Sequence, residues 1–245
     1  MYFKNMNLVN YRFGSNEEPA LFDNLTTYVD LLDQLRDSVT VYTTEYIQED
    51  ERPDQMSARL YGGNPNFHWT FFLVNKNLRE QGWPVTEQDI RVLAKKRYPH
   101  WVVTTKSKIA TLDKFYPGDT VEGLSSGSVG TVVERRLDLG QIIIRGDDNF
   151  NAERIVSGDT AAERNENFID AVADSPLNWE AVHHYINSDG DYTDIDPYTQ
   201  VSSGLVPVTF LERLISANTD LKSVAVIRPD NIETIALDIY SKLGR

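Results

Sequence analysis

The chain has 245 residues, with 24 Lys or Arg against 37 Asp or Glu, so its formal net charge is −13 and its pI is near 4.7. Such an acidic surface repels phosphates, so we expect neither a nucleic acid nor an anionic membrane as a partner. The sequence has no cysteine, which excludes disulfides, thiolate nucleophiles and cysteine-based zinc sites. Because it also lacks a long apolar stretch, we expect a soluble protein that is not secreted.

The first predicted element is an amphipathic helix over residues 21–35. Its apolar residues recur every three or four positions, as on one buried helix face: Leu21, Leu25, Tyr28, Val29, Leu32 and Leu35. Residues 39–47 (VTVYTTEYI) alternate in polarity and are rich in β-branched and aromatic types, which predicts a strand.

Two short helices that both begin at a proline are predicted next. Pro53 suits the first turn of a helix because its missing N–H would be unpaired there, and the Gly62-Gly63 pair ends that helix. Asn64 can cap a second helix that begins at Pro65 and runs toward residue 75. We expect the bulky rings of this second helix to lie in the core. The residues assigned to it are Trp69, Phe72 and Leu73.

A third helix is predicted next, and the residue composition then changes. Thr86 can cap a helix whose apolar residues are Ile90, Leu93, Ala94 and Tyr98. Between residues 115 and 157, short β-branched runs are divided by Gly, Ser, Pro and Asp, which predicts a small unit of four or five strands. The run GDTVEG…SGSVGTVV…GQIIIRG resembles an SH3-like barrel, in which glycines permit sharp corners.

The C-terminal third is predicted to be mostly helical. Residues 160–185 read as a partly acidic helical segment that leads into a polar loop, NSDGDYTDIDPYTQVSSG. Thr209 and Glu212 form a capping box for a further helix, residues 223–227 (SVAVI) predict a strand, and Pro229 opens the last helix. That helix carries an apolar stripe that must dock on something: Ile232, Ile235, Ala236, Ile239 and Leu243.

The predicted fold class is therefore α+β, with three consecutive domains. Residues 1–110 hold an N-terminal helix and a β-α-α-β module, residues 111–160 hold the SH3-like β unit, and residues 161–245 hold the acidic loop and a helix-strand-helix segment. The β-α-α-β module resembles a LysM domain, whose pattern of a small-residue helix, Tyr-Gly, Asn-Pro, an aromatic and a closing Asn is met here. The matching residues are Ala58, Tyr61, Gly62, Asn64, Pro65, Trp69 and Asn75. Two departures are the extra Gly63 and the acidic ERPD in place of the usual Gly-Asp.

A wider resemblance covers residues 1–100 and 205–245. The order of Tyr11-Arg12-Phe13-Gly14, RPDQMSARLYGGNPNFHWTFFLVN, GWP and Val226-Ile227-Arg228-Pro229 is similar to the small LysM-containing baseplate wedge subunit of T4-like contractile-tailed phages, the gene fifty-three product family. The β unit and the acidic loop lie outside this match and look like an insertion.

The resemblance implies a structural protein of the virion tail, assembled in the host cytoplasm, that joins neighbouring wedges around the central hub. It implies contacts with other wedge proteins, and with the hub or the sheath-initiating ring, and it implies no enzymatic activity and no cofactor. Candidate interface residues are Tyr61, Gly62, Asn64, Trp83, Tyr11, Arg12 and Arg228, and the expected structural core is Trp69, Phe72, Leu73, Ile232, Ile235 and Ile239.

Alternative chemistry finds little support in the residue patterns. His68 and the His183-His184 pair lack metal-ligand spacing, so we expect no metal site, and the acidic loop around Asp189 and Asp191 lacks the DxDxDG order of calcium loops. The SSGS run at 125–128 is not a nucleophile elbow, because it lacks the G-x-S-x-G order.

Two functions from different classes remain. The first is the assembly component described above. The second is a carbohydrate-binding tail or cell-wall protein, in which Tyr61, Asn64 and the segment around Trp83 line a shallow groove for a β-1,4-linked amino sugar. The SH3-like unit could also bind a peptide of another tail protein.

Overall fold

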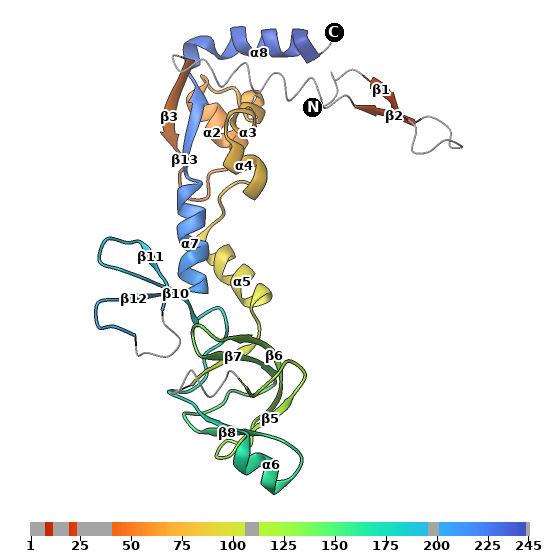
Figure 1. The fold of residues 1–245 in the computed structure, drawn as a ribbon. Helices are drawn as coiled ribbons and strands as arrows, with labels where there is room; N and C mark the ends of the chain where they lie inside the picture. The colour runs from red at the N-terminus through yellow and green to blue at the C-terminus, as the bar shows by residue number, and fades with distance from the viewer. Residues whose placement is uncertain (1–7, 12–19, 24–40, 106–112, 196–200, 244–245) are drawn as a thin grey trace. The chain divides into compact units, whose positions relative to one another are not determined.

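A computed structural model describes residues 8–11, 20–23, 41–105, 113–195 and 201–243 of the chain (Figure 1). The chain contains both helices and strands, as the α+β prediction requires. It divides into two compact units: unit 1 is Met1–Thr86 with Asn218–Arg245, and unit 2 is Glu87–Ala217. Unit 2 is thus inserted into unit 1, and these boundaries do not coincide with the three consecutive segments predicted above.

The sheet of unit 1 explains why its two parts belong together. Strand β3 (Tyr42–Tyr46) pairs antiparallel with β13 (Ser223–Ile227). The pairing extends at both ends, since the Ile47 N–H donates to the Lys222 carbonyl and the Arg228 N–H donates to the Val41 carbonyl, each at 2.9 Å. Both predicted strands are confirmed. The prediction of a β-α-α-β module within residues 1–110 is wrong in its second strand, because helices follow α3 and the partner of β3 is β13 from the C-terminal part of the chain.

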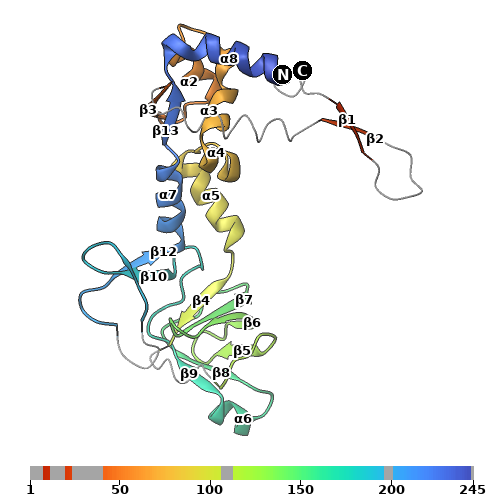
Figure 2. The ribbon, with the colours of Figure 1, turned by 45° about the horizontal axis from the view of Figure 1, so that its top comes forward.

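The helices between these strands begin where the prolines predict. Helix α2 (Pro53–Leu60) ends before Gly62 and Gly63, whose φ angles of +59° and +90° favour glycine. The Asn64 side chain then accepts a hydrogen bond from the Asn66 N–H at 2.9 Å. The second helix divides into a 3₁₀ turn, η3 (Pro65–Phe67), and α3 (Trp69–Val74), and α4 (Lys76–Gln81) follows. Figures 1 and 2 show α2 and α3 on one face of the β3–β13 pair.

Two aromatic residues of α3, Trp69 and Phe71, are buried in the core of unit 1, as expected, beside aliphatic residues of the strands, α2, α4 and α8. Phe71 is fully buried and packs with the sheet, while Trp69 and Leu73 face the last helix, α8 (Pro229–Leu243). The predicted core residues Ile232 and Ile239 are also buried. Two others, Phe72 and Ile235, are partly buried against the same clusters. The side chain of Leu243 lies outside the described residues.

Asn75 closes the outer edge of β13. Its carboxamide donates to the Ala225 carbonyl at 2.7 Å and accepts from the Ala225 N–H at 2.9 Å, so one side chain replaces a neighbouring strand. The same carboxamide nitrogen also donates to the Phe71 carbonyl at 2.9 Å. This side chain therefore links the end of α3 to a strand 150 positions away in sequence.

Replacing Asn75 by Ala is expected to lower the free energy of unfolding of unit 1 by about 1–2 kcal/mol, because it leaves part-buried backbone groups without partners. Urea unfolding followed by circular dichroism measures this loss. Asn77→Ala, an exposed change in the same region, is the matched control and should change stability little. Equal stability of the Asn75 and Asn77 variants would contradict the prediction.

Helix α5 (Glu87–Arg97) and the first turns of helix α7 (Phe210–Asp220) share an apolar cluster in unit 2. Helix α5 buries Ile90 and Ala94 against Trp179 and Leu211. Leu93, expected on the same face, is instead 49% exposed, because the contact uses only a narrow stripe of the helix. Helix α7 begins with the predicted capping box. In that box the Glu212 N–H donates to the Thr209 hydroxyl and the Thr209 N–H donates to the Glu212 carboxylate, at 3.1 and 2.7 Å.

The β unit predicted between residues 115 and 157 is confirmed, and it is larger than expected. Its antiparallel sheet has the order β4-β7-β6-β5-β8-β9. The two edge strands meet through a bridge between Thr105 and Ala171 and through a 2.9 Å bond from the Val172 N–H to the Thr104 carbonyl, so the sheet closes on itself (Figure 2). The strands are β4 (Trp101–Thr104), β5 (Thr120–Gly123), β6 (Val129–Arg136), β7 (Gln141–Gly146), β8 (Arg154–Ser157) and β9 (Phe168–Asp170).

The helical segment predicted for residues 160–185 is wrong beyond its first turns. Only α6 (Ala161–Glu166) is helical; β9 follows, and Ile169 is buried opposite Ile155 of β8. A few apolar residues in a short segment fit both the helical and the strand period. Here the pairing with β8 makes residues 168–170 a strand. Residues farther along form a second small sheet, ordered β11-β10-β12. Its strands are β10 (Val182–Ile186), β11 (Tyr192–Thr193) and β12 (Val206–Thr209).

The predicted N-terminal helix is also wrong where it can be compared. Residues 21–23 belong to β2 (Ala20–Asp23), which pairs antiparallel with β1 (Leu8–Tyr11), and Leu21 lies opposite Asn10. Cross-strand pairing therefore overrides the helical period at this end. The rest of the predicted helix lies outside the described residues.

Candidate functional site

Three of the predicted interface residues meet in an open groove of unit 1. The groove lies between the turn that follows α2 and the first turns of α8. Its floor includes the buried side chains of Tyr61 and Ile232. The lining residues are Tyr61, Gly62, Asn64, Phe67, Pro229, Asp230, Ile232, Glu233 and Thr234. We call this surface the α8 groove.

Tyr61 is a fixed part of this floor. Its hydroxyl donates to the Ile227 carbonyl at 3.0 Å, and its ring contacts Phe67 edge-on and Phe71 in a stacked arrangement, with centroids 5.6 and 6.1 Å away. Burial raises the pKa of Tyr61 to about 12. The hydroxyl therefore stays protonated at neutral pH and has a structural role.

Asn64 fixes the turn that forms the groove wall opposite α8. Besides capping η3, it accepts a hydrogen bond from the Ser57 hydroxyl through its carbonyl at 2.8 Å, and its N–H donates to the Tyr61 carbonyl at 3.1 Å. These bonds fix the backbone from Tyr61 to Asn64. The groove wall is thus preformed rather than assembled on binding.

The structure does not bring the other predicted interface residues into the groove lining. Arg228 precedes it, and its guanidinium donates to the Tyr42 carbonyl at 3.2 Å. Trp83 donates from its indole N–H to the Glu51 carbonyl at 2.7 Å, and its ring packs on Phe71 and Phe72. Tyr11 is exposed on β1, and Arg12 lies outside the described residues.

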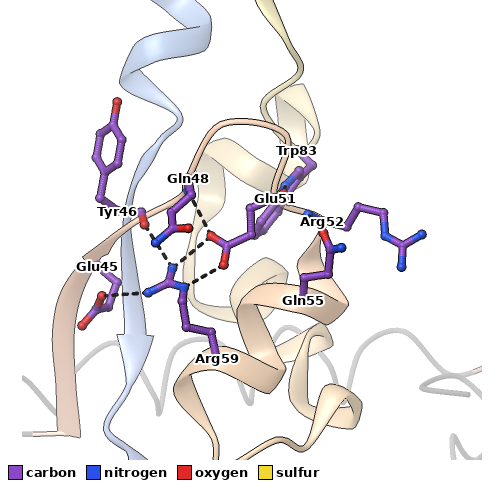
Figure 3. A network of polar contacts seen from close by, with 8 residues as sticks. All are labelled: Glu45, Tyr46, Gln48, Glu51, Arg52, Gln55, Arg59 and Trp83. Carbon is purple, nitrogen blue, oxygen red and sulfur yellow. Dashed lines mark hydrogen bonds and ion pairs between the residues drawn. The ribbon is translucent and has the colours of Figure 1, made fainter.

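A polar network organises the turn between β3 and α2 (Figure 3). The indole N–H of Trp83 donates to the Glu51 carbonyl in this turn. Arg59 forms a two-pronged pair with the Glu51 carboxylate at 2.7 and 3.0 Å and also donates to the Tyr46 carbonyl at 3.2 Å. Glu45 lies 3.7 Å from the same guanidinium. Burial alone would raise the pKa of Glu51, but the hydrogen bond and charge of Arg59 lower it below its usual value. Glu51 therefore stays ionised and tied to Arg59, a poor arrangement for a general acid or base.

Sequence reasoning missed this network. Glu51 and Arg59 are separated by eight positions, outside the three- and four-residue spacings that predict pairs on a helix. Only the fold of the turn brings them together. The acidic ERPD departure from the LysM pattern thus contributes one carboxylate to an internal ion pair.

A histidine pair forms a second polar cluster, within unit 2. The His183 and His184 Nδ1 atoms are 2.9 Å apart, and an Arg213 Nη1 lies 2.9 Å from His183 Nε2. Arginine only donates, so His183 Nε2 accepts; His183 Nδ1 then carries the proton and donates to His184. The His183 ring also packs edge-on against Phe210 at 4.6 Å. This arrangement needs both imidazoles neutral.

The cluster predicts a pH dependence for unit 2. Burial, followed by the charges of Arg213 and nearby groups, lowers the pKa of His183 and of His184 below the ordinary 6.5. Since the unfolded chain then binds protons more readily, the associated stability is complete above pH 6.5 and is lost as the pH falls through 6.5 toward the lower folded pKa. Thermal melts on either side of pH 6.5 measure this loss.

A matched pair of variants tests the assignment. His183→Gln should flatten the pH dependence in this window, whereas His68→Gln, an exposed change in unit 1, should leave it unchanged. A His183 variant that keeps the full pH dependence would show that another group is responsible.

The described residues show no cluster of three or more metal-ligating side chains. None of the helices in the described ranges combines the length and apolar character that a membrane crossing requires.

No family model matches the chain, and no curated protein sequence matches it. The class that the fold defines is a mixed helix-and-strand protein with an all-antiparallel closed sheet inserted into a helix-covered β3–β13 pair.

Proposed function

We propose that the chain is a structural component of a phage tail baseplate wedge that joins neighbouring wedges around the central hub. The observation that carries the proposal is the arrangement of unit 1: α2 and the turn η3 each begin at a proline and precede α3 on the β3–β13 pair, Asn64 caps η3, and Asn75 bonds to β13. This is the arrangement expected of a LysM-like module. In this proposal unit 1 is that module, and the closed sheet of unit 2 is an SH3-like insertion.

The mechanism is thermodynamic rather than chemical. Each surface contact of a wedge subunit is weak, but closing a ring makes the last contacts intramolecular and raises their effective concentration. A preformed surface such as the α8 groove suits this role because little conformational entropy is lost on docking. The partners in this proposal are other wedge proteins, neighbouring wedges and the hub or the sheath-initiating ring, and no cofactor takes part.

The second candidate, a carbohydrate-binding tail or wall protein, draws less support. It requires Tyr61, Asn64 and Trp83 to share one groove, whereas Trp83 packs on Phe71 and Phe72 and lies outside the α8 groove lining.

Co-expression with the other wedge proteins, followed by sizing and a chitin-oligomer binding assay on the same preparation, tests the two functions together. A stable complex with no sugar binding is expected. Sugar binding by a chain that joins no complex would overturn the proposal in favour of the second candidate.

A further inference from the structure

The α8 groove combines an apolar floor with an acidic wall. Phe67, half-buried, and Ile232, buried, form part of the floor, while Asp230 and Glu233 line the wall and are exposed. The two acids are three residues apart in α8, which places their side chains side by side on the helix surface. The start of α8 itself contributes only about half a positive charge, so the wall remains negative.

These two carboxylates differ from others in unit 1. Glu51 and Asp54 each form an ion pair with an arginine, at 2.7 and 2.8 Å. Within the described residues, Asp230 and Glu233 form no ion pair and no side-chain hydrogen bond. Neighbouring like charges on a helix repel each other, so a cation between them would relieve the repulsion.

The opposite wall leaves room for such a cation to enter. Gly62 has no side chain, and apart from Gly62 itself and its two chain neighbours no heavy atom lies within 4 Å of the position that a Cβ would occupy there. Asn64 also lines this side of the groove, and its side-chain oxygen is used by the Asn66 N–H. The groove is therefore open above its apolar floor, with carboxylate acceptors on the α8 side.

Building on the assembly function proposed above, we infer that the α8 groove binds an arginine side chain presented by a partner protein. The aliphatic stem of the arginine lies on Phe67 and Ile232, and the guanidinium lies against Asp230 and Glu233. Arginine fits better than lysine because its planar, weakly hydrated head stacks on aromatic rings and pairs with carboxylates through several N–H groups. A formal charge of −13 on this chain favours such a basic partner.

The test uses the full chain and two synthetic peptides, acetyl-Gly-Gly-Arg-Gly-Gly-amide and its citrulline counterpart, which is isosteric but neutral. Nuclear magnetic resonance titration should show saturable shifts at the backbone amides of Gly62 and Thr234 with the arginine peptide. The citrulline peptide should bind more weakly than the arginine peptide, by a factor of up to about five, as expected for exposed ion pairs. Added salt should weaken the arginine complex and leave the citrulline complex nearly unchanged.

A variant pair locates the effect. The double change Asp230→Asn with Glu233→Gln should reduce arginine-peptide binding to the level of the citrulline peptide, while Asp238→Asn, on the same helix outside the groove lining, should bind normally. The citrulline comparison needs no variant, so it stands even if the double change weakens α8.

Equal binding of the two peptides, or shifts confined to residues outside the groove, would overturn the inference. Groove shifts caused by a chitin oligomer instead of the arginine peptide, or by self-association of the chain, would do the same. Arginine binding by the isolated chain is measured without wedge proteins, so a failure of wedge joining and a failure of this site are seen separately.

Discussion

Trp69→Ala is expected to lower the free energy of unfolding of unit 1 by about 3–5 kcal/mol. The indole is only 8% exposed and packs in one cluster with Leu73, Ala236 and Ile239, and its ring lies 5.4 Å from that of Tyr240. Removing it leaves a cavity between α3 and α8 that neither helix can close without shifting. A loss of this size is a large share of the roughly 5–15 kcal/mol that stabilises a typical domain, so unit 1 should unfold at a much lower temperature and urea concentration than in the wild type.

Thermal and urea unfolding of the full chain, followed by circular dichroism, measures the loss. His68→Ala is the matched control because His68 is the neighbouring residue and is exposed. A Trp69 variant that melts with the wild type would mean that α8 does not depend on this contact. In the co-expression experiment, the same variant should fail to join a wedge complex while unit 2 retains its fold.

The parts of the fold that could be predicted from sequence depend on local chemistry. Proline at the start of α2 and of α8, the Gly62-Gly63 stop and the Thr209-Glu212 box all act within a few residues, and each of these elements is confirmed. Strands β3 and β13 were also predictable from their composition. Their pairing was not, because it joins residues that are far apart in sequence and leaves no local signal.

The wrong predictions have the same physical origin. In residues 21–23 and 168–185, apolar residues fit a helical period, but strand partners elsewhere in the chain decide the conformation. The candidate site divides in the same way. Tyr61, Gly62 and Asn64 are adjacent in sequence and were found together, whereas the acidic wall of α8 comes from the other end of the chain and was missed.

Glu153→Gln is expected to lower the free energy of unfolding of unit 2 by about 2–3 kcal/mol, since hydrogen bonds to a buried charged group are worth more than neutral ones. The Glu153 carboxylate is buried and holds the turn between β5 and β6. It accepts hydrogen bonds from the Ser126 N–H at 2.9 Å, the Ser126 hydroxyl at 2.5 Å and the Asn151 N–H at 3.1 Å, and a further one from the Ser125 N–H. Glutamine presents an NH₂ group where these donors need an acceptor.

The same hydrogen bonds determine the pH range in which Glu153 stabilises unit 2. Burial by itself would raise the pKa of Glu153, but the hydrogen bonds from Ser126 and Ser125 lower it to about 2, from an ordinary value of 4.5. Because the folded pKa is the lower one, Glu153 contributes stability above pH 4.5 that is lost as the pH falls toward 2. Urea unfolding in this window should therefore show a smaller pH dependence for the Glu153 variant than for the wild type. Glu166→Gln, an exposed change at the end of α6, is the control and should behave as the wild type.

Gly123 provides an independent check on the role of this carboxylate. A Cβ at Gly123 would lie 2.4 Å from Glu153 Oε1 and 2.6 Å from the Ser126 hydroxyl, far closer than contact distance. Gly123→Ala should therefore destabilise unit 2 in the wild-type chain. It should cost less when Glu153 is already Ala, because the clash with the carboxylate and the hydrogen bonds that it disturbs are then absent. Non-additive losses in this double-mutant cycle are expected. Strictly additive losses would mean that Gly123 and Glu153 act on separate parts of the sheet, and that the turn is held by something other than the carboxylate.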